Sequence, residues 1–311
     1  MNQLFWNAYN RLEKEVLALS EVIHFDDHQK SVYSSRIGDL LVRSVIEIES
    51  LSKVLFDAEG GVRPSGRDLY FDTDCLALLE KKWRISRKTI FISSPYFYFD
   101  DEENKKLTPL HKAFKRGTSS SKWQRAYQAI KHDRLNNLRQ GNVENLLNAL
   151  GALYILNIYY RNATIDDVKD KDASNIDWGL GSDIFTVKIS PESERVSATK
   201  IYEPKTDYEE SIYLVKHTDK TAQAFIDLMR RLDEEALHTA SNAIADALNK
   251  KVKDGELNVF HDLNEIKEVI KDLYDKQKIL ALRQEAQKKG IQIASLINDL
   301  RFEAVLNKQQ Y

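Results

Sequence analysis

Residues 123–134 bring together side chain types that could carry out chemistry. Their sequence is WQRAYQAIKHDR, and Arg125, Gln128 and His132 fall on one side of a helix. Arg125 and His132 lie within about 20° of each other around the helix and roughly 10.5 Å apart along its axis. An arginine binds anions, and a histidine exchanges protons near neutral pH. These three residues therefore form the candidate site of the chain.

The opposite side of the same helix is expected to hold the site in place. Trp123, Tyr127 and Ile130 are spaced by four and three residues, which is the pattern of a helix face buried against a partner. Residues 117–121, GTSSS, are interpreted as a flexible lead that ends in a serine suited to cap the helix. We expect the helix to continue to about Gly141.

Periodic apolar residues predict a mainly α protein whose N-terminal part is a helical bundle. Residues 3–20 have the pattern of an amphipathic helix, and a second helix is expected between the acidic cap at Asp26 and Asp27 and the turn at Gly60. Apolar residues surround the segment 142–160 almost completely, which is typical of a central helix of a bundle.

Two segments between these helices are assigned from local patterns. Residues 88–99, KTIFISSPYFYF, are β-branched and aromatic with a proline inside, so they predict an extended segment or an edge strand. Residues 107–115 are predicted to form a further short helix.

The composition changes about halfway along the chain and indicates two domains. Residues 1–163 are assigned to the helical bundle, and residues 164–311 to an α+β region for interaction or oligomerisation. Short β-prone runs within 183–216 indicate a small antiparallel sheet or an insert with long loops. Helical periodicity within 219–308 predicts long C-terminal helices, of which the last covers 291–306.

The composition also limits the classes of function. With 46 basic and 48 acidic residues among 311, the net charge is −2, so nucleic acid binding would need a local basic cleft. A single cysteine, Cys75, excludes an intrachain disulfide and is expected to be a buried structural thiol. The longest apolar run is too short and too polar to span a bilayer, and the first residues lack a signal peptide pattern. We therefore expect a cytoplasmic protein with no membrane contact and no cofactor.

Two other clusters contain residue types that occur in metal or catalytic sites. His24 and His28 flank two aspartates at a spacing found in metal sites, but a cap formed by the aspartates is the favoured interpretation. Asp72 and Asp74 are also interpreted as a cap. No phosphate loop, dinucleotide fingerprint or serine hydrolase elbow is present, which argues against those enzyme classes. No metal site is predicted.

The site helix and the apolar helix after it resemble the HEPN superfamily, whose members share an Arg-x4-6-His motif. In this chain the motif consists of Arg125, six intervening residues and His132, within residues 120–160. Many members of that superfamily are metal-independent ribonucleases of defence, toxin and RNA-processing systems. The string from Tyr127 to Arg134 also resembles HEPN-like families that have no established activity.

The resemblance implies an RNA-cleaving or RNA-binding effector. His132 would exchange a proton with a ribose 2′-hydroxyl or with the leaving oxygen, and Arg125 would stabilise the phosphorane. The side chains that would bind the substrate are Gln128, Lys131, Arg134 and Arg139. Sites of this kind in the superfamily usually form across a symmetric dimer, so the resemblance also implies a homodimer.

The alternative is a non-catalytic helical interaction or scaffold protein. In that case Arg125 and His132 face solvent or pair with acidic side chains of a neighbouring helix. The amphipathic C-terminal helices would then supply a surface for a partner or for a second copy of the chain.

Overall fold

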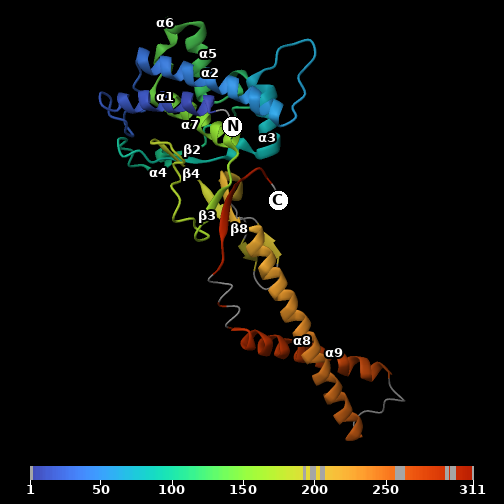
Figure 1. The fold of residues 1–311 in the computed structure, drawn as a ribbon. Coiled ribbons are helices and arrows are strands. Elements are labelled where there is room, and N and C mark those ends of the chain that lie inside the picture. The colour runs from blue at the N-terminus through green and yellow to red at the C-terminus, as the bar shows by residue number, and fades with distance from the viewer. Residues whose placement is uncertain are drawn as a thin grey trace. The chain divides into compact units, whose positions relative to one another are not determined.

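The computed structural model describes residues 3–191, 194–196, 201–203, 207–255, 263–290, 294 and 299–309. It confirms a mainly α protein with a smaller β portion (Figure 1).

Three long helices form the centre of the N-terminal bundle. They are α1 (Leu4–Leu19), α2 (Ser35–Ala58) and α7 (Val143–Arg161). As the sequence predicts, α7 is buried on nearly all sides, and it begins at the Asn142 cap, whose side chain accepts a hydrogen bond from the Asn145 N–H. The cap of α2 is Ser34, so the prediction that Asp26 and Asp27 cap this helix is wrong.

The site helix is shorter than predicted. It is α5 (Lys122–His132), and the chain then turns at Asp133 into α6 (Arg134–Asn137) and a 3-10 turn (Leu138–Gln140). Asp133 has an extended φ of −151°, and its side chain accepts a hydrogen bond from the Asn136 N–H. Because this side chain caps a new helix, His132 is the last residue of α5 and not a residue of its interior.

A three-stranded sheet has β1 (Ile90–Ile92) in its middle. Its neighbours are β2 (Lys106–Leu107) and β4 (Phe185–Val187), both antiparallel to it. The prediction of an edge strand is therefore wrong, because the proline that suggested an edge follows the strand and lies in a turn.

A second sheet has four strands in the order β3 (Ile165–Val168), β9 (Phe302–Leu306), β8 (Tyr213–His217) and β5 (Ile189–Pro191). Strands β5 and β8 are parallel, so the sheet is not purely antiparallel. Strands β6 (Glu194–Val196) and β7 (Ile201–Glu203) pair with each other antiparallel. The predicted helix over 291–306 is wrong at its end, where β9 buries alternate residues Ala304 and Leu306; residues 291–293 and 295–298 lie outside the described residues.

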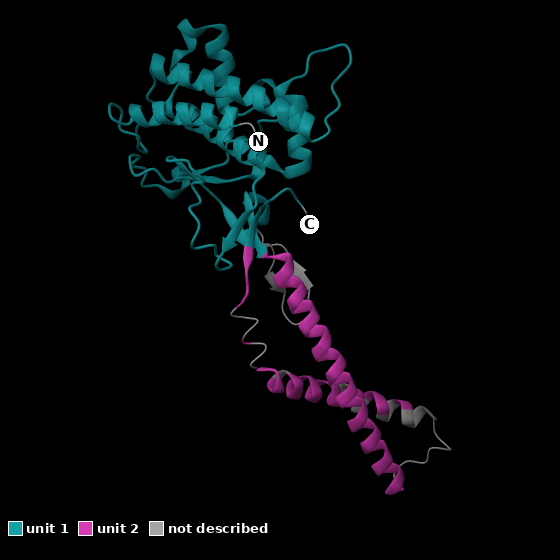
Figure 2. Ribbon diagram, in the orientation of Figure 1, with its two compact units in different colours: residues 1–216, 303–311 teal, residues 217–302 magenta. Residues whose placement is uncertain are grey.

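The chain divides into two compact units (Figure 2). Unit 1 contains Met1–Lys216 and Glu303–Tyr311, and unit 2 contains His217–Phe302. The boundary therefore differs from the composition change near residue 163. The reason is that the segment after α7 packs on the bundle: the Tyr154 hydroxyl donates a hydrogen bond of 2.8 Å to the Gly179 carbonyl oxygen, and β4 joins β1.

Unit 2 is formed mainly by α8 (Asp219–Lys253) and α9 (Leu263–Lys288). Among the described side chains, Ala236, Ala240 and Ala281 form a cluster between the two helices, with Leu282 beside them. Small residues of this kind allow close approach of the backbones.

The remaining short elements all belong to unit 1. They are a π-helix (Phe71–Leu76), α3 (Ala77–Trp83), α4 (Glu102–Lys105) and 3-10 turns at Ile85–Arg87, Gly117–Ser119 and Tyr208–Glu210. Among the helices that the structure describes, none combines the length and the apolar character needed to cross a membrane.

Candidate functional site

The N-terminal end of α5 is closed by a capping box. The Ser121 side chain accepts a hydrogen bond from the Gln124 N–H, and the Gln124 side chain accepts one from the Ser121 N–H, as a serine cap at this position predicts. The N–H groups of the first two helical residues have no acceptor within the helix, so this end of α5 carries partial positive charge.

Two buried side chains of α5 hold the preceding loop. The Trp123 indole N–H donates a hydrogen bond of 2.7 Å to the Pro109 carbonyl oxygen. The Gln124 side chain amide donates one of 2.8 Å to the Ala113 carbonyl oxygen. Both side chains are at most 4% exposed, so these two bonds fix the loop against α5.

The loop held in this way presents a histidine and a lysine outward. Leu110 and Ala113 are fully buried, whereas His111 and Lys112 between them are exposed. Lys112 has a φ of +60°, in the left-handed region that a regular helix excludes. The prediction of a helix over 107–115 is therefore wrong, because the positive φ of Lys112 interrupts helical geometry.

The Arg125 guanidinium lies at the same end of α5. Its Nη1 atom donates hydrogen bonds to the carbonyl oxygens of Thr118 and Ser120 in the loop. This direction follows from helix geometry, since side chains lean toward the N-terminus of their helix. The loop contains a 3-10 turn, and the Ser120 hydroxyl donates a hydrogen bond of 2.7 Å to the Gly117 carbonyl oxygen.

Two hollows meet at Arg125. The first has a volume of about 460 Å³ and is bounded by the loop, the start of α5 and the start of α7. The second has a volume of about 490 Å³ and lies between the loop and the π-helix that begins at Phe71. Thr118, Ser120 and Arg125 border both hollows. Hollows of about 300–1,000 Å³ are of the size that small ligands occupy.

The first hollow has an excess of positive charge. His111, Lys112, Lys122 and Arg125 line it, and the acidic side chain among the lining residues is Glu144. Glu144 pairs with Lys122 at 2.9 Å. After that pairing, Lys112 and Arg125 still contribute two positive charges, beside hydroxyl groups of the loop. This combination suits an anion such as a phosphate.

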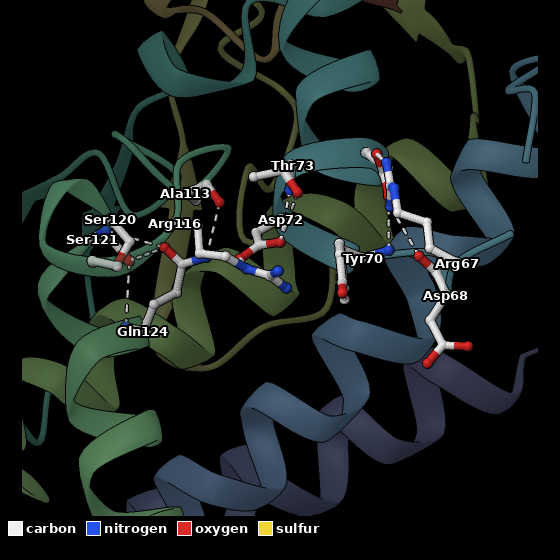
Figure 3. A network of polar contacts seen from close by, with 12 residues as sticks. Arg67, Asp68, Tyr70, Asp72, Thr73, Ala113, Arg116, Ser120, Ser121 and Gln124 are labelled. Atoms are coloured by element: carbon white, nitrogen blue, oxygen red, sulfur yellow. Dashed lines mark hydrogen bonds and ion pairs between the residues drawn. The ribbon is translucent and has the colours of Figure 1, made fainter. Parts of the chain in front are cut away.

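The second hollow has less excess positive charge, because Arg116 is paired with Asp72 and, among the described lining residues, only Arg125, shared with the first hollow, remains. Figure 3 shows Arg116 directed toward Asp72, and the distance from Arg116 Nε to Asp72 Oδ2 is 3.1 Å. The Arg116 guanidinium also lies 3.7 Å from the centroid of the Tyr70 ring. Nearby, hydrogen bonds from Arg67 lower the pKa of Asp74 to about 2. Gln128, predicted as a substrate-binding residue, lines this hollow.

The other predicted site residues lie toward the far end of α5. His132 and Arg139 are exposed, the Lys131 ammonium lies 5.3 Å from the centroid of the Tyr127 ring, and Arg134 pairs with Asp39 at 2.6 Å. In the described part of the chain, these four predicted residues are absent from the lining of both hollows. The structure thus brings Arg125 and Gln128 together and leaves His132 at the opposite end of the helix.

The remaining clusters have structural roles. Asp26 accepts hydrogen bonds from the N–H groups of His28 and Gln29, and Asp27 accepts bonds from residues 100, 101 and 104. The aspartates therefore hold turns and a neighbouring loop, and they do not cap a helix as predicted. Cys75 is buried as predicted, and burial raises the pKa of its thiol to about 12. Over the described ranges, no three His, Cys, Asp or Glu side chains are grouped to hold a metal ion.

Sequence reasoning missed His111, Lys112 and Lys122. A signal for the two lysines was present, because residues 112–122, KAFKRGTSSSK, place basic and hydroxyl side chains directly before a helix N-terminus. His111 had no such signal. Comparison with known proteins adds no further assignment, since no family model matches the chain and neither the curated proteins nor the solved structures contain a significant match.

Proposed function

We propose that unit 1 binds RNA at the N-terminal end of α5, as a HEPN-like RNA-binding or RNA-cleaving domain. The observation that carries the proposal is the first hollow, where Lys112 and Arg125 supply unbalanced positive charge beside a helix N-terminus. The chain as a whole has a net charge of −2, so a local site of this kind is what nucleic acid binding requires.

The shape and the polar lining favour RNA as the anion. The two hollows share Arg125, so a strand could place consecutive phosphates or a phosphate and a ribose on either side of it. Ser119, Ser121 and Asn148 line the first hollow and offer partners for a ribose 2′-hydroxyl. Single-stranded RNA is the form whose backbone can enter such hollows.

The resemblance to the HEPN superfamily supports a further part of the proposal, a metal-independent endoribonuclease that uses Arg125 and His132 in a homodimer. His132 is exposed at the end of α5, and Leu135 beside it is 91% exposed. Both side chains are therefore accessible to a second copy of the chain, as a site formed across a dimer would require.

The proposal is tested by measuring the affinity of the full chain for short mixed-sequence single-stranded RNA. We expect Arg125→Ala to weaken binding about tenfold, because a charge-assisted hydrogen bond contributes about 1.5–3 kcal/mol. Arg63→Ala is the matched control, since Arg63 is an exposed arginine paired with Asp57 and lies outside both hollows. Equal affinities of the two variants, or no binding by the wild type, would contradict the proposal.

A second function, assembly through unit 2, is favoured by the exposed apolar side chains of α8. Phe225, Ile226 and Leu237 of α8 are 44–58% exposed. A helix gains stability when a partner covers such apolar side chains. This corresponds to the alternative of an interaction or scaffold protein.

Light scattering of the full chain tests this second function. Replacing Ile226 and Leu237 by Asp should dissociate an assembly that depends on these side chains. The control replaces the exposed polar residues His238 and Asn249 by Asp, since they lie about 120° further round α8. An unchanged mass for the first variant would exclude this surface.

A further inference from the structure

The first hollow contains a histidine that the Arg-x6-His motif does not include. His111 and Arg125 line the same hollow of about 460 Å³, although they belong to different segments of the chain. A proton-transfer group has to lie within hydrogen-bond reach of the atom on which it acts. His111 therefore meets the first requirement for a group that acts beside Arg125.

The main chain on both sides of His111 is held against α5. Trp123 and Gln124 directly precede Arg125 and are buried. They donate hydrogen bonds to the carbonyl oxygens of Pro109 and Ala113. In the sequence, His111 lies midway between those two acceptors. It is part of a turn in which the His111 N–H donates a hydrogen bond of 2.9 Å to the Thr108 carbonyl oxygen. The same two side chains thus position the loop and the helix, which is the support that a preorganised site requires.

His132 does not share this arrangement. The guanidinium of Arg125 contacts carbonyl oxygens that precede α5, whereas His132 is the last residue of α5, roughly 10.5 Å further along the axis. A single phosphate held in the first hollow would therefore lie at the end of α5 opposite to His132.

We infer that the first hollow receives the scissile phosphate of an RNA strand and that His111 is the group that exchanges the proton there. This inference rests on the proposed function, since it names the residue that would act on an RNA bound at that site. The hydrogen bonds from Arg125 to the loop carbonyls come from Nη1, and a guanidinium also has N–H donors on Nε and Nη2, which would bind the phosphate.

The step is a transesterification within the RNA. The ribose 2′-oxygen forms a bond to phosphorus, and the bond from phosphorus to the 5′-oxygen breaks. The proton of the 2′-hydroxyl goes to the neutral imidazole of His111, and the leaving 5′-oxygen takes a proton from water. The imidazolium returns its proton to the hydroxide that remains, so the products are a 2′,3′-cyclic phosphate and a 5′-hydroxyl. Arg125 and Lys112 stabilise the added negative charge of the phosphorane.

The test compares His111→Ala with His132→Ala in the full chain, with a metal chelator present. Cleavage of mixed-sequence RNA is followed by mass spectrometry of the cyclic phosphate ends, and binding is measured separately. We expect His111→Ala to reduce the maximal cleavage rate about 100-fold or more, with RNA affinity retained. His28→Ala, which replaces an exposed histidine outside both hollows, should keep the wild-type rate, and His132→Ala should lose less activity than His111→Ala. Since His111 is exposed, His111→Ala should change the free energy of unfolding by less than about 0.5 kcal/mol. His111→Asn, a second substitution at the same position, checks this result independently.

Three results would overturn the inference, and they have different consequences. Loss of cleavage in His132→Ala with full activity in His111→Ala would assign the proton transfer to His132. A wild-type chain that binds RNA without cleaving it would leave the RNA-binding proposal intact and remove the role of His111. A wild-type chain that does not bind RNA would contradict the proposed function itself.

Discussion

The two ends of α5 differ in how their polar side chains are held. At the N-terminal end, buried Trp123 and Gln124 bind main-chain carbonyl groups, so Arg125 borders hollows of defined shape. At the C-terminal end, His132 is exposed and the chain turns away at Asp133. A side chain contributes to chemistry when its surroundings fix its position. The difference indicates that a sequence motif identifies which residue types are present, whereas the packing around them determines which end of α5 can serve as a site.

The largest expected effect is a difference in how much a substitution at each end of α5 lowers the free energy of unfolding. Trp123→Ala should lower the free energy of unfolding by about 3–5 kcal/mol, because a 2% exposed tryptophan and its hydrogen bond are lost. Leu135→Ala, near the other end, should change it by less than about 0.5 kcal/mol, because Leu135 is 91% exposed. Chemical denaturation measures both values, and similar losses would contradict the comparison.

A smaller loss is expected from Gln124→Ala. The Ala113 carbonyl oxygen would lose its donor and the capping box would open, which together cost about 1–3 kcal/mol. RNA affinity should fall as well, although Gln124 is buried, because the loop that carries Lys112 would no longer be held. The control is Gln128→Ala, an exposed glutamine on the same helix, whose stability should match the wild type. An unchanged stability of Gln124→Ala would show that the loop is held by other contacts.

The free energy of unfolding should depend on pH because of Lys88, so the two ends of α5 have to be compared at one pH. Lys88 is fully buried, and its Nζ donates hydrogen bonds to the carbonyl oxygens of Glu209 and Ser211. Burial lowers its pKa from 10.5 to about 7. Between these values the unfolded chain holds a proton that the folded chain has released, so stability should rise with pH by up to about 1.4 kcal/mol per unit.

Unfolding measured between about pH 7.5 and 9.5 checks this dependence. Lys88→Met keeps a side chain of similar length without the titrating group, so its stability should vary less over the same range. An equal slope for the wild type and for Lys88→Met would contradict the assignment to Lys88.

The smallest expected effect is at the C-terminal end of α5. Arg134 and Asp39 form an ion pair of 2.6 Å with side chains that are 47% and 52% exposed. Solvent screens such pairs, so a double-mutant cycle with Arg134→Ala and Asp39→Ala should give a coupling below about 1 kcal/mol. A clearly larger coupling would show that this end is held as firmly as the other.

Local sequence patterns were sufficient to predict the burial of α7 and the buried face and cap of α5. The apolar residues of α7 surround the helix, the spacing of Trp123, Tyr127 and Ile130 identifies the buried face of α5, and Ser121 caps it as predicted. In each case the signal lies within a few turns of the same helix, where spacing alone determines which side is buried.

Contacts between distant segments determined what the sequence did not reveal. β9 is a strand because it lies between β3 and β8, and residues 107–115 form a non-helical loop whose carbonyl groups accept hydrogen bonds from Trp123 and Gln124. His111 joins Arg125 through those same bonds. Tertiary interactions of this kind override local propensity, so a site assembled by them is not visible as a motif.

The most direct test of the account is the salt dependence of RNA binding by Arg125→Ala and Arg134→Ala. Both variants remove one arginine, at opposite ends of the segment formed by α5 and α6. Each lost phosphate contact should reduce the slope of log affinity against log salt by about 0.7 for a single strand. The account predicts that reduction for Arg125→Ala and the wild-type slope for Arg134→Ala. A reduced slope for Arg134→Ala with a wild-type slope for Arg125→Ala would contradict it.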